Sequence, residues 1–123
     1  MKARLRIRVD FEEGTILSPG KVRLFELVDE CGSVAQAAAT IQMDYEHARH
    51  VIERLELLFG GPLIITQNDG RNTSRSKLTE LGRNVVERYH VAERISADAA
   101  ERALGDLISL APEKTLLMPI QGK

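Results

Sequence analysis

A strongly periodic stretch at residues 45–59 limits the possible folds of this sequence. Its apolar residues recur at steps of three and four: Tyr45, Ala48, Ile52, Leu55 and Phe59. That spacing places them on one face of an α-helix, while the opposite face carries polar side chains. Asp44 suits the N-cap of this helix, and the glycines that follow residue 59 suit its end. The stretch therefore predicts an amphipathic helix that packs on other elements through one face.

Two shorter helices are expected before it. Residues 19–31 follow a Ser18-Pro19 start, which suits a cap and a first helical position, and they stop at Gly32. Ser33 can cap residues 34–40, and residues 41–43 break the pattern. A short helix, a tight turn and a longer amphipathic helix form a helix-turn-helix, whose second helix can enter the major groove of DNA. Plain helical hairpins produce the same pattern, so the motif alone leaves both interpretations open.

A hairpin is expected after the periodic helix. Residues 63–66 are apolar and rich in β-branched side chains, and residues 67–75 contain no apolar residue and suggest a loop. Residues 76–78 could then pair back as a short second strand. The order of elements predicts an α+β, mainly α, fold: a winged helix-turn-helix.

A long helix is predicted at residues 79–110, with Thr79 as its cap and Pro112 beyond its end. One stripe of this helix holds Leu81, Val85, Tyr89, Ala92, Ile95, Ala99, Ala103 and Leu107. The stripe could pack on its own domain, but it is longer than so small a domain can cover. We therefore favour a two-fold homodimer made through this helix. The predicted organisation is one domain at residues 1–110 and a flexible tail at 111–123.

Near the N-terminus, apolar and polar residues alternate over positions 4–11. This period of two predicts a strand with one buried face, followed by a turn at residues 12–14. Arg4, Arg6 and Arg8 share the other face. They could contact DNA, but the charged outer face of an edge strand explains them as well, and we prefer that interpretation.

Composition limits the functional classes. The chain of 123 residues has a formal net charge of −1, so any attraction to nucleic acid must come from local positive charge. It has one cysteine, Cys31, and lacks a signal peptide and a membrane-length apolar run, which favours a cytoplasmic protein with no membrane partner. No catalytic or phosphate-binding motif is present, and His47, His50 and His90 do not form a metal-ligand pattern. We expect no enzymatic activity, no cofactor and no metal site.

Several motifs of the chain resemble the N-terminal DNA-binding domain of molybdenum-responsive regulators of the ModE type. The similar segments are residues 32–38, residues 41–45 with Ala48 and Ile52, residues 62–64, and the run Leu78-Thr79-Glu80-Leu81-Gly82, which LysR-type regulators share. The resemblance covers residues 18–108 in order and spacing. It implies a homodimer made through the N-terminus and the long helix, recognition of double-stranded DNA by residues 44–54, and backbone contact by the wing.

The sequence departs from this family at several points. Gln42 stands where a turn glycine is usual, and a left-handed backbone there would cost about 1 kcal/mol or more. Arg49 replaces a frequent tryptophan, and residues 68–75 replace a glycine-rich wing. The chain also ends where such regulators begin their oxyanion-binding domains. We therefore do not expect this chain to bind molybdate.

Ten residues are candidates for DNA contact. Arg49 could donate twice to guanine, Glu46 could accept from cytosine, and the cations near the wing could bind phosphates. The full set is Ser33, Gln36, Tyr45, Glu46, Arg49, His50, Arg71, Asn72, Arg75 and Lys77. Alternatives remain open: Ser33 can be a simple cap, the wing an ordinary polar loop, and the outer face of the periodic helix a solvated surface.

Two functions follow from these observations. The favoured one is a sequence-specific transcriptional regulator that binds DNA as a homodimer without its own molybdate-sensing domain. The rival is a protein-interaction adaptor that keeps the winged-helix shape but does not bind DNA. The rival draws support from the acidic balance of residues 44–56, which hold four carboxylates and two arginines.

Overall fold

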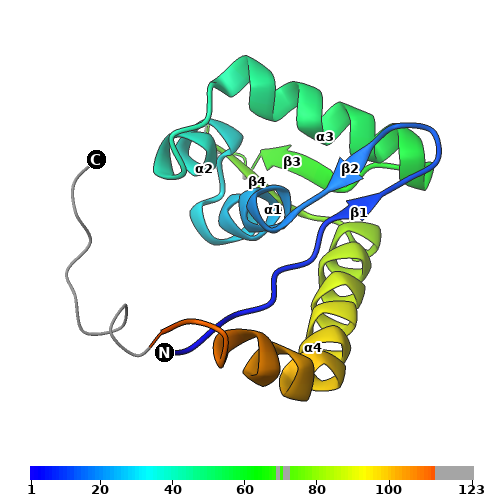
Figure 1. The fold of residues 1–123 in the computed structure, drawn as a ribbon. Coiled ribbons are helices and arrows are strands. Elements are labelled where there is room, and N and C mark those ends of the chain that lie inside the picture. The colour runs from blue at the N-terminus through cyan, green and yellow to red at the C-terminus, as the bar shows by residue number, and fades with distance from the viewer. Residues whose placement is uncertain (69, 71–72, 113–123) are drawn as a thin grey trace.

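The computed structural model describes residues 1–68, 70 and 73–112. The segments that surround the helix-turn-helix are two short antiparallel hairpins and a long last helix (Figure 1). In chain order the elements are β1 (Val9–Asp10), β2 (Ile16–Leu17), α1 (Pro19–Cys31), α2 (Val34–Thr40), α3 (Tyr45–Phe59), β3 (Ile64–Asn68), β4 (Ser74–Leu78) and α4 (Glu80–Ile108).

The first three helices begin and end where the sequence predicts. Ser18, Ser33 and Asp44 each accept a hydrogen bond from the backbone N–H three residues later, so each satisfies a donor that the first turn leaves unpaired. Gly32 and Gly60 end α1 and α3 in the left-handed conformation. These boundaries depend on local chemistry, which explains why the sequence alone located them.

The core lies where α1, α2 and α3 meet the start of the β3–β4 hairpin. Phe25, Leu55 and Leu63 are its largest fully buried side chains together with Leu24, Val22 and Val28. Ala37, Ala38 and Ala48 are buried as well, which lets α2 and α3 cross closely. This packing presents the outer face of α3 to solvent.

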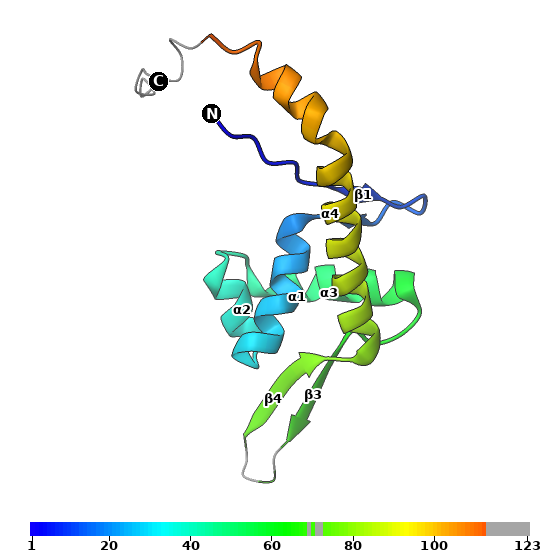
Figure 2. The same ribbon diagram turned by 90° about the horizontal axis from the view of Figure 1, so that it is seen from below.

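The β3–β4 hairpin forms the wing and is longer than predicted. Its strands pair from Ile64 with Leu78 to Asn68 with Ser74, so they include much of the segment that the sequence assigned to a loop. The hydroxyls of Thr66 and Ser76 hydrogen-bond across the strands at 2.8 Å. Backbone pairing does not need apolar side chains, and the polarity of this segment therefore concealed its strands. Figure 2 shows the hairpin projecting from the helices.

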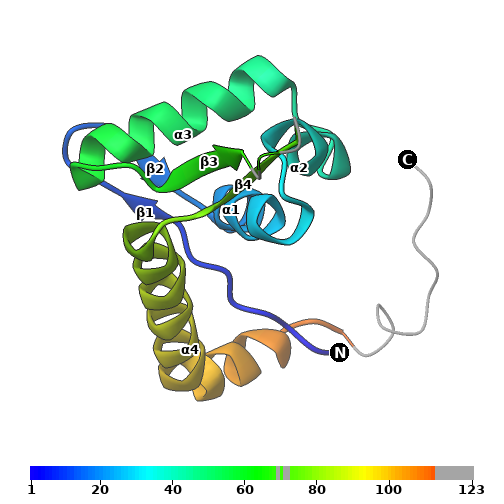
Figure 3. The same ribbon diagram turned by 180° about the vertical axis from the view of Figure 1, so that it is seen from behind.

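The predicted N-terminal strand over residues 4–11 is wrong for most of its length. Only Val9 and Asp10 form a strand, paired with Leu17 and Ile16. Because Ser18 begins α1 directly after β2, the chain provides no further partner for residues 4–8. These residues instead run toward α4 (Figure 3), where the Tyr89 hydroxyl donates to the Ile7 carbonyl oxygen at 2.7 Å. The alternation of apolar side chains reflects half-burial without a sheet.

The long helix α4 packs on the core through its first half. Tyr89 is buried, and Leu81, Val85 and Val86 are partly buried against the core. Further along the predicted stripe, Ile95 and Leu107 are each 61% exposed. Figure 2 shows α4 continuing beyond the body of the domain. The predicted helix is confirmed to residue 108, and the described residues leave the apolar stripe of its second half exposed.

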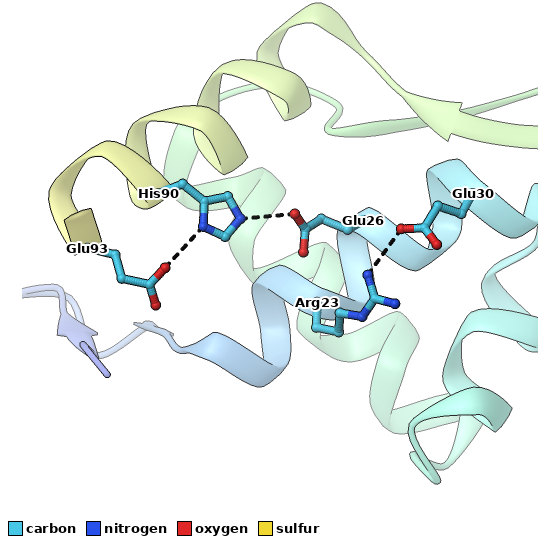
Figure 4. Close-up of polar contacts among 5 residues, drawn as sticks. All are labelled: Arg23, Glu26, Glu30, His90 and Glu93. Atoms are coloured by element: carbon cyan, nitrogen blue, oxygen red, sulfur yellow. Dashed lines mark hydrogen bonds and ion pairs between the residues drawn. The ribbon is translucent and has the colours of Figure 1, made fainter. Parts of the chain in front are cut away.

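One polar contact fastens α4 to α1 (Figure 4). His90 of α4 contacts Glu26 of α1 through Nε2 at 2.9 Å and Glu93 through Nδ1 at 3.1 Å. Because carboxylates only accept hydrogen bonds, both contacts are satisfied together when both ring nitrogens carry protons. Burial lowers the pKa of His90, but the hydrogen bonds and charges of Glu26 and Glu93 outweigh it, and the net pKa is raised. The histidine therefore acts as a charged link between the two helices.

Candidate DNA-binding surface

The outer face of α3 is the centre of the candidate surface. Ala48, Val51, Ile52 and Leu55 turn toward the core. The polar residues between them are exposed and include three of the predicted contacts, Glu46, Arg49 and His50, with Tyr45 at the start of the helix 45% exposed. The structure thus brings together, on one accessible helix face, all four α3 residues that the sequence singled out.

Two of the four carboxylates in this segment have structural roles. The Asp44 carboxylate accepts the His47 N–H at 3.3 Å as the helix cap. The Glu56 carboxylate accepts from the Leu63 N–H at 2.9 Å and from the Ile64 N–H at 3.4 Å, which fixes the start of the wing to α3. All four keep their negative charge, and Asp44, Glu46 and Glu53 are exposed, so the acidic balance noted in the sequence remains.

Arg49 lies on the side of α3 that faces β3. A shallow hollow of about 220 Å³ separates Tyr45 and Arg49 from Ile64. The Arg49 guanidinium is 3.6 Å from the Glu53 carboxylate, and both side chains are more than half exposed. Such a surface ion pair contributes roughly 0.2–1 kcal/mol, so a base or phosphate could replace Glu53 as the partner at little cost.

Two predicted contacts lie at the start of α2. Ser33 Oγ accepts the Gln36 N–H at 3.1 Å and so acts as the cap. Gln36 is exposed. The capping role leaves the Ser33 hydroxyl proton available to a phosphate, so the two interpretations of Ser33 are compatible.

The wing carries the remaining candidates. Lys77 is exposed, whereas Arg71 and Asn72 lie outside the described residues. Arg75 has an intramolecular role that the sequence did not indicate. Its guanidinium donates to the Asp29 carbonyl oxygen at 3.1 Å and, more weakly, to that of Glu30 at 3.5 Å. A cation on these last carbonyls of α1 is favoured by the helix dipole.

Other bonds also hold the wing against α1. The Leu78 N–H donates to the Asp29 carboxylate at 2.9 Å, and the Ser76 N–H donates to the Gly32 carbonyl oxygen at 2.9 Å. A Cβ atom on Gly32 would lie 2.5 Å from the Arg75 guanidinium, so the arginine packs directly on this glycine. The base of the wing is consequently fixed relative to the helix-turn-helix.

The turn between α2 and α3 has a left-handed backbone at Gln42, the conformation that a glycine at this position would adopt most easily. Gln42 has φ 56°, and among the non-glycine residues that the structure describes it alone has a positive φ. The Gln42 and Met43 N–H groups donate to the carbonyl oxygens of Ala39 and Ala38 at 3.1 and 2.8 Å. The left-handed backbone considered in the sequence analysis is therefore present, and it occurs at a residue that has a side chain.

Sequence reasoning missed the part of the surface that the β1–β2 hairpin provides. Arg54 of α3 donates to Thr15 Oγ1 at 3.2 Å and lies 4.0 Å from the Glu13 carboxylate. Glu13 in turn accepts from the Thr15 hydroxyl at 2.7 Å and from its N–H, and these bonds lower the pKa of Glu13. The two-residue strands are too short to give a periodic signal, so nothing in the sequence placed this hairpin beside α3.

Within residues 1–68, 70 and 73–112, no three histidine, cysteine or acidic side chains gather in a way that could hold a metal ion. No helix there is both long and apolar enough to span a membrane.

Comparison with known proteins supports the same fold. Residues 20–83 match the family described as bacterial regulatory helix-turn-helix protein, lysR family. The chain is 31% identical over 97 residues to the molybdenum transport protein ModE of Azotobacter vinelandii, covering 79% of this chain and 36% of that protein. It is 25% identical over 93 residues to the transcriptional regulator ModE of Haemophilus influenzae, covering 76% and 36%.

A third relative is the molybdenum-pterin-binding protein MopA of Rhodobacter capsulatus, 31% identical over 98 residues, which cover 78% of this chain and 36% of that protein. The chain therefore spans about a third of the length of these relatives. The matched region runs from α1 through the wing to the start of α4, which are the elements that build the exposed α3 face. The chain belongs to the lysR family of bacterial regulatory helix-turn-helix proteins.

Proposed function

We propose that this chain is a sequence-specific DNA-binding transcriptional regulator that places α3 in the major groove. The observation that carries the proposal is the exposed α3 face, supported from below by α1 and α2 and flanked by the wing. The major groove is about 12 Å wide and accepts one helix. Arg49 and Glu46 would contact base edges, and His50 and Tyr45 would contact bases or the adjoining backbone.

The phosphate contacts would come from either side of α3. Ser33 and Gln36 lie at the start of α2, and Lys77 lies on the wing. Arg75 would act mainly by holding the wing, because its guanidinium is engaged with α1. Arg71 and Asn72 remain proposed contacts from the sequence alone. Contacts of this kind position a protein on DNA without reading its sequence.

We further propose that the chain acts as a homodimer joined through α4. The exposed apolar residues Ile95 and Leu107 lie on this helix. Near the start of α4, a mostly apolar groove of about 470 Å³ is lined by Leu81, Val85 and Ala92 together with Val9 and Phe59. A second copy related by a two-fold axis would cover both features. It would also present two recognition helices to two half-sites one helical turn or a multiple apart.

Molybdate responsiveness is not carried over from the relatives. Two of these relatives are named for molybdenum transport and molybdenum-pterin binding, and this chain matches 36% of each. That this chain does not itself bind molybdate stays a prediction from the sequence, and titration calorimetry with molybdate tests it.

A gel shift with DNA from upstream of the protein's own gene tests the function. We expect a retarded complex that unrelated competitor DNA displaces poorly. Arg49→Ala should abolish this preference, whereas Arg23→Ala, which removes a half-exposed arginine from the side of α1 that carries Glu26 and Glu30, should leave it intact. The proposal would be overturned if DNA binding depended neither on the DNA sequence nor on the presence of Arg49. Failure to bind any DNA at low salt would favour the adaptor.

A further inference from the structure

A second polar hollow lies on the opposite side of α3 from Arg49. We call it the hairpin cleft; it is bounded by Gly14 and Thr15 of the β1–β2 turn, Lys21 of α1, and His47, His50 and Arg54 of α3. Its volume is about 130 Å³, the space of roughly four water molecules in the liquid. The cleft is therefore large enough for a small polar group and too small for a folded partner.

Ile16 and Val51 also line the cleft, and its polar side chains carry hydrogen-bond donors. Lys21 donates one of its three N–H groups to the Ile16 carbonyl oxygen at 2.9 Å, which leaves two for another acceptor. Arg54 uses one N–H toward Thr15 and retains others. His47 and His50 are exposed, and a neutral or charged imidazole can donate to an oxygen.

The charges of the cleft favour an anion. Burial lowers the pKa of Lys21, and the nearby positive charges of Arg54 and Arg8 lower it further. These cations are thus held close enough to repel one another. The neighbouring acid is Glu13, whose carboxylate is bonded to Thr15 and stands 4.0 Å from Arg54, so it offsets part of this charge from the rim.

The position of the cleft identifies the anion. An α-helix with its side chains is about 10–12 Å across, close to the width of the major groove, so both flanks of a bound helix lie against phosphates. Arg49 and the wing occupy one flank of α3, and the hairpin cleft occupies the other.

We propose that the hairpin cleft binds a backbone phosphate of the DNA strand that borders α3 on the side away from the wing. Lys21 and Arg54 supply the charge, and His47 and His50 supply further donors. The inference rests on the proposed function, because it requires α3 to lie in the major groove.

Non-specific binding to a mixed-sequence duplex tests the cleft without knowledge of the operator. Each phosphate contact contributes about 0.9 to the slope of log affinity against log salt. Lys21→Gln should lower that slope by about 0.9 and weaken binding roughly 8-fold for each protomer at about 0.1 M salt, which amounts to about 1.8 and roughly 60-fold for the proposed dimer. Glu13→Gln, which removes the acid at the rim, should strengthen binding. Arg23→Gln removes one half-exposed charge from the side of α1 that carries Glu26 and Glu30, and it should leave the slope unchanged.

Lys21→Arg separates charge from structure. It keeps the charge, so it should keep the wild-type slope, and the thermal midpoint of each variant verifies folding. If the slopes of Lys21→Gln and Arg23→Gln are equal, or if Lys21→Arg lowers the slope as much as Lys21→Gln, the phosphate site is overturned while the DNA-binding function stands. Wild-type protein that binds no DNA overturns both.

Discussion

At the residue scale, Gln42 carries a conformational cost that a single substitution can remove. Its φ of 56° lies where a Cβ atom is disfavoured by roughly 1–2 kcal/mol, and the side chain is exposed. Gln42→Gly should therefore raise the free energy of unfolding by about 1 kcal/mol, measured by urea denaturation.

Gln36→Gly provides the matched comparison. It makes the same chemical change inside α2, where the backbone is helical, and should lower the free energy of unfolding by roughly 0.5–1 kcal/mol. If both substitutions destabilise the protein equally, the left-handed turn does not strain Gln42.

Single residues also show where sequence reasoning stops. The expectation for Gln42 could be formed from a local motif, because turn geometry depends on neighbouring residues. Arg75 could not be assigned in this way. Its acceptors belong to Asp29 and Glu30, which are 46 and 45 positions away in the sequence. The same holds for Lys21 and His47, which share a cleft only because α1 and α3 pack together.

At the scale of elements, Gly82 fixes the approach of α4 to the wing. A Cβ atom at this position would lie 2.3 Å from the Leu63 carbonyl oxygen, which already accepts the Thr79 N–H. Gly82→Ala should therefore destabilise the protein by about 1–3 kcal/mol, because the backbone must shift. Chemical denaturation measures the change.

Gly105 offers the opposite case on the same helix. Within residues 1–68, 70 and 73–112, no atom outside the helix backbone lies within 4 Å of a Cβ atom at this position, so Gly105→Ala should add helix propensity worth about 0.8–1.0 kcal/mol. A neutral effect of Gly82→Ala would show that the close contact between α4 and the wing does not exist.

The link between α1 and α4 should depend on pH. The net pKa of His90 is raised because Glu26 and Glu93 together outweigh the effect of burial. A raised pKa means that the stabilisation is fully present below the pKa of the unfolded chain and is lost as the pH rises through the folded-state pKa. Beside this link, Arg23 and Glu30 of α1 form a separate ion pair at 3.1 Å (Figure 4).

His90→Gln checks this link. The difference in unfolding free energy between wild type and variant should be largest at low pH and shrink as the pH rises through the folded-state pKa of His90. Because the His90 side chain is 41% exposed, solvent screens the pair, and a difference of roughly 0.2–1 kcal/mol is expected. A difference that stays constant with pH would contradict a charged link.

Elements differ in how well the sequence specified them. Helices α1 to α4 were predicted because caps and a period of three to four residues are local. The N-terminal strand was predicted wrongly because alternation reveals a half-buried face but not whether another strand lies alongside. The predicted wing was too short because its strands are polar. Strand β2 was not predicted, because its two residues are too few to show a periodic pattern.

At the scale of the whole molecule, α4 should determine the oligomeric state. We expect the wild-type chain to sediment as a dimer and Ile95→Asp to sediment as a monomer, because a charge would enter the apolar stripe. Leu57→Asp is the control: Leu57 is 81% exposed on α3, away from that stripe, and its variant should remain a dimer. A monomeric wild type, or a dimer that tolerates Ile95→Asp, would refute this interface.

In the proposed function, α3 reads DNA sequence as one half of a two-fold pair. Selection of bound duplexes from a randomised pool is the decisive experiment. The wild-type protein should enrich a palindromic sequence whose half-sites are one helical turn or a multiple apart, and Arg49→Ala should lose the preference at one position of each half-site. A pool that stays random after selection, or a wild-type motif that Arg49→Ala leaves unchanged, would contradict the claim.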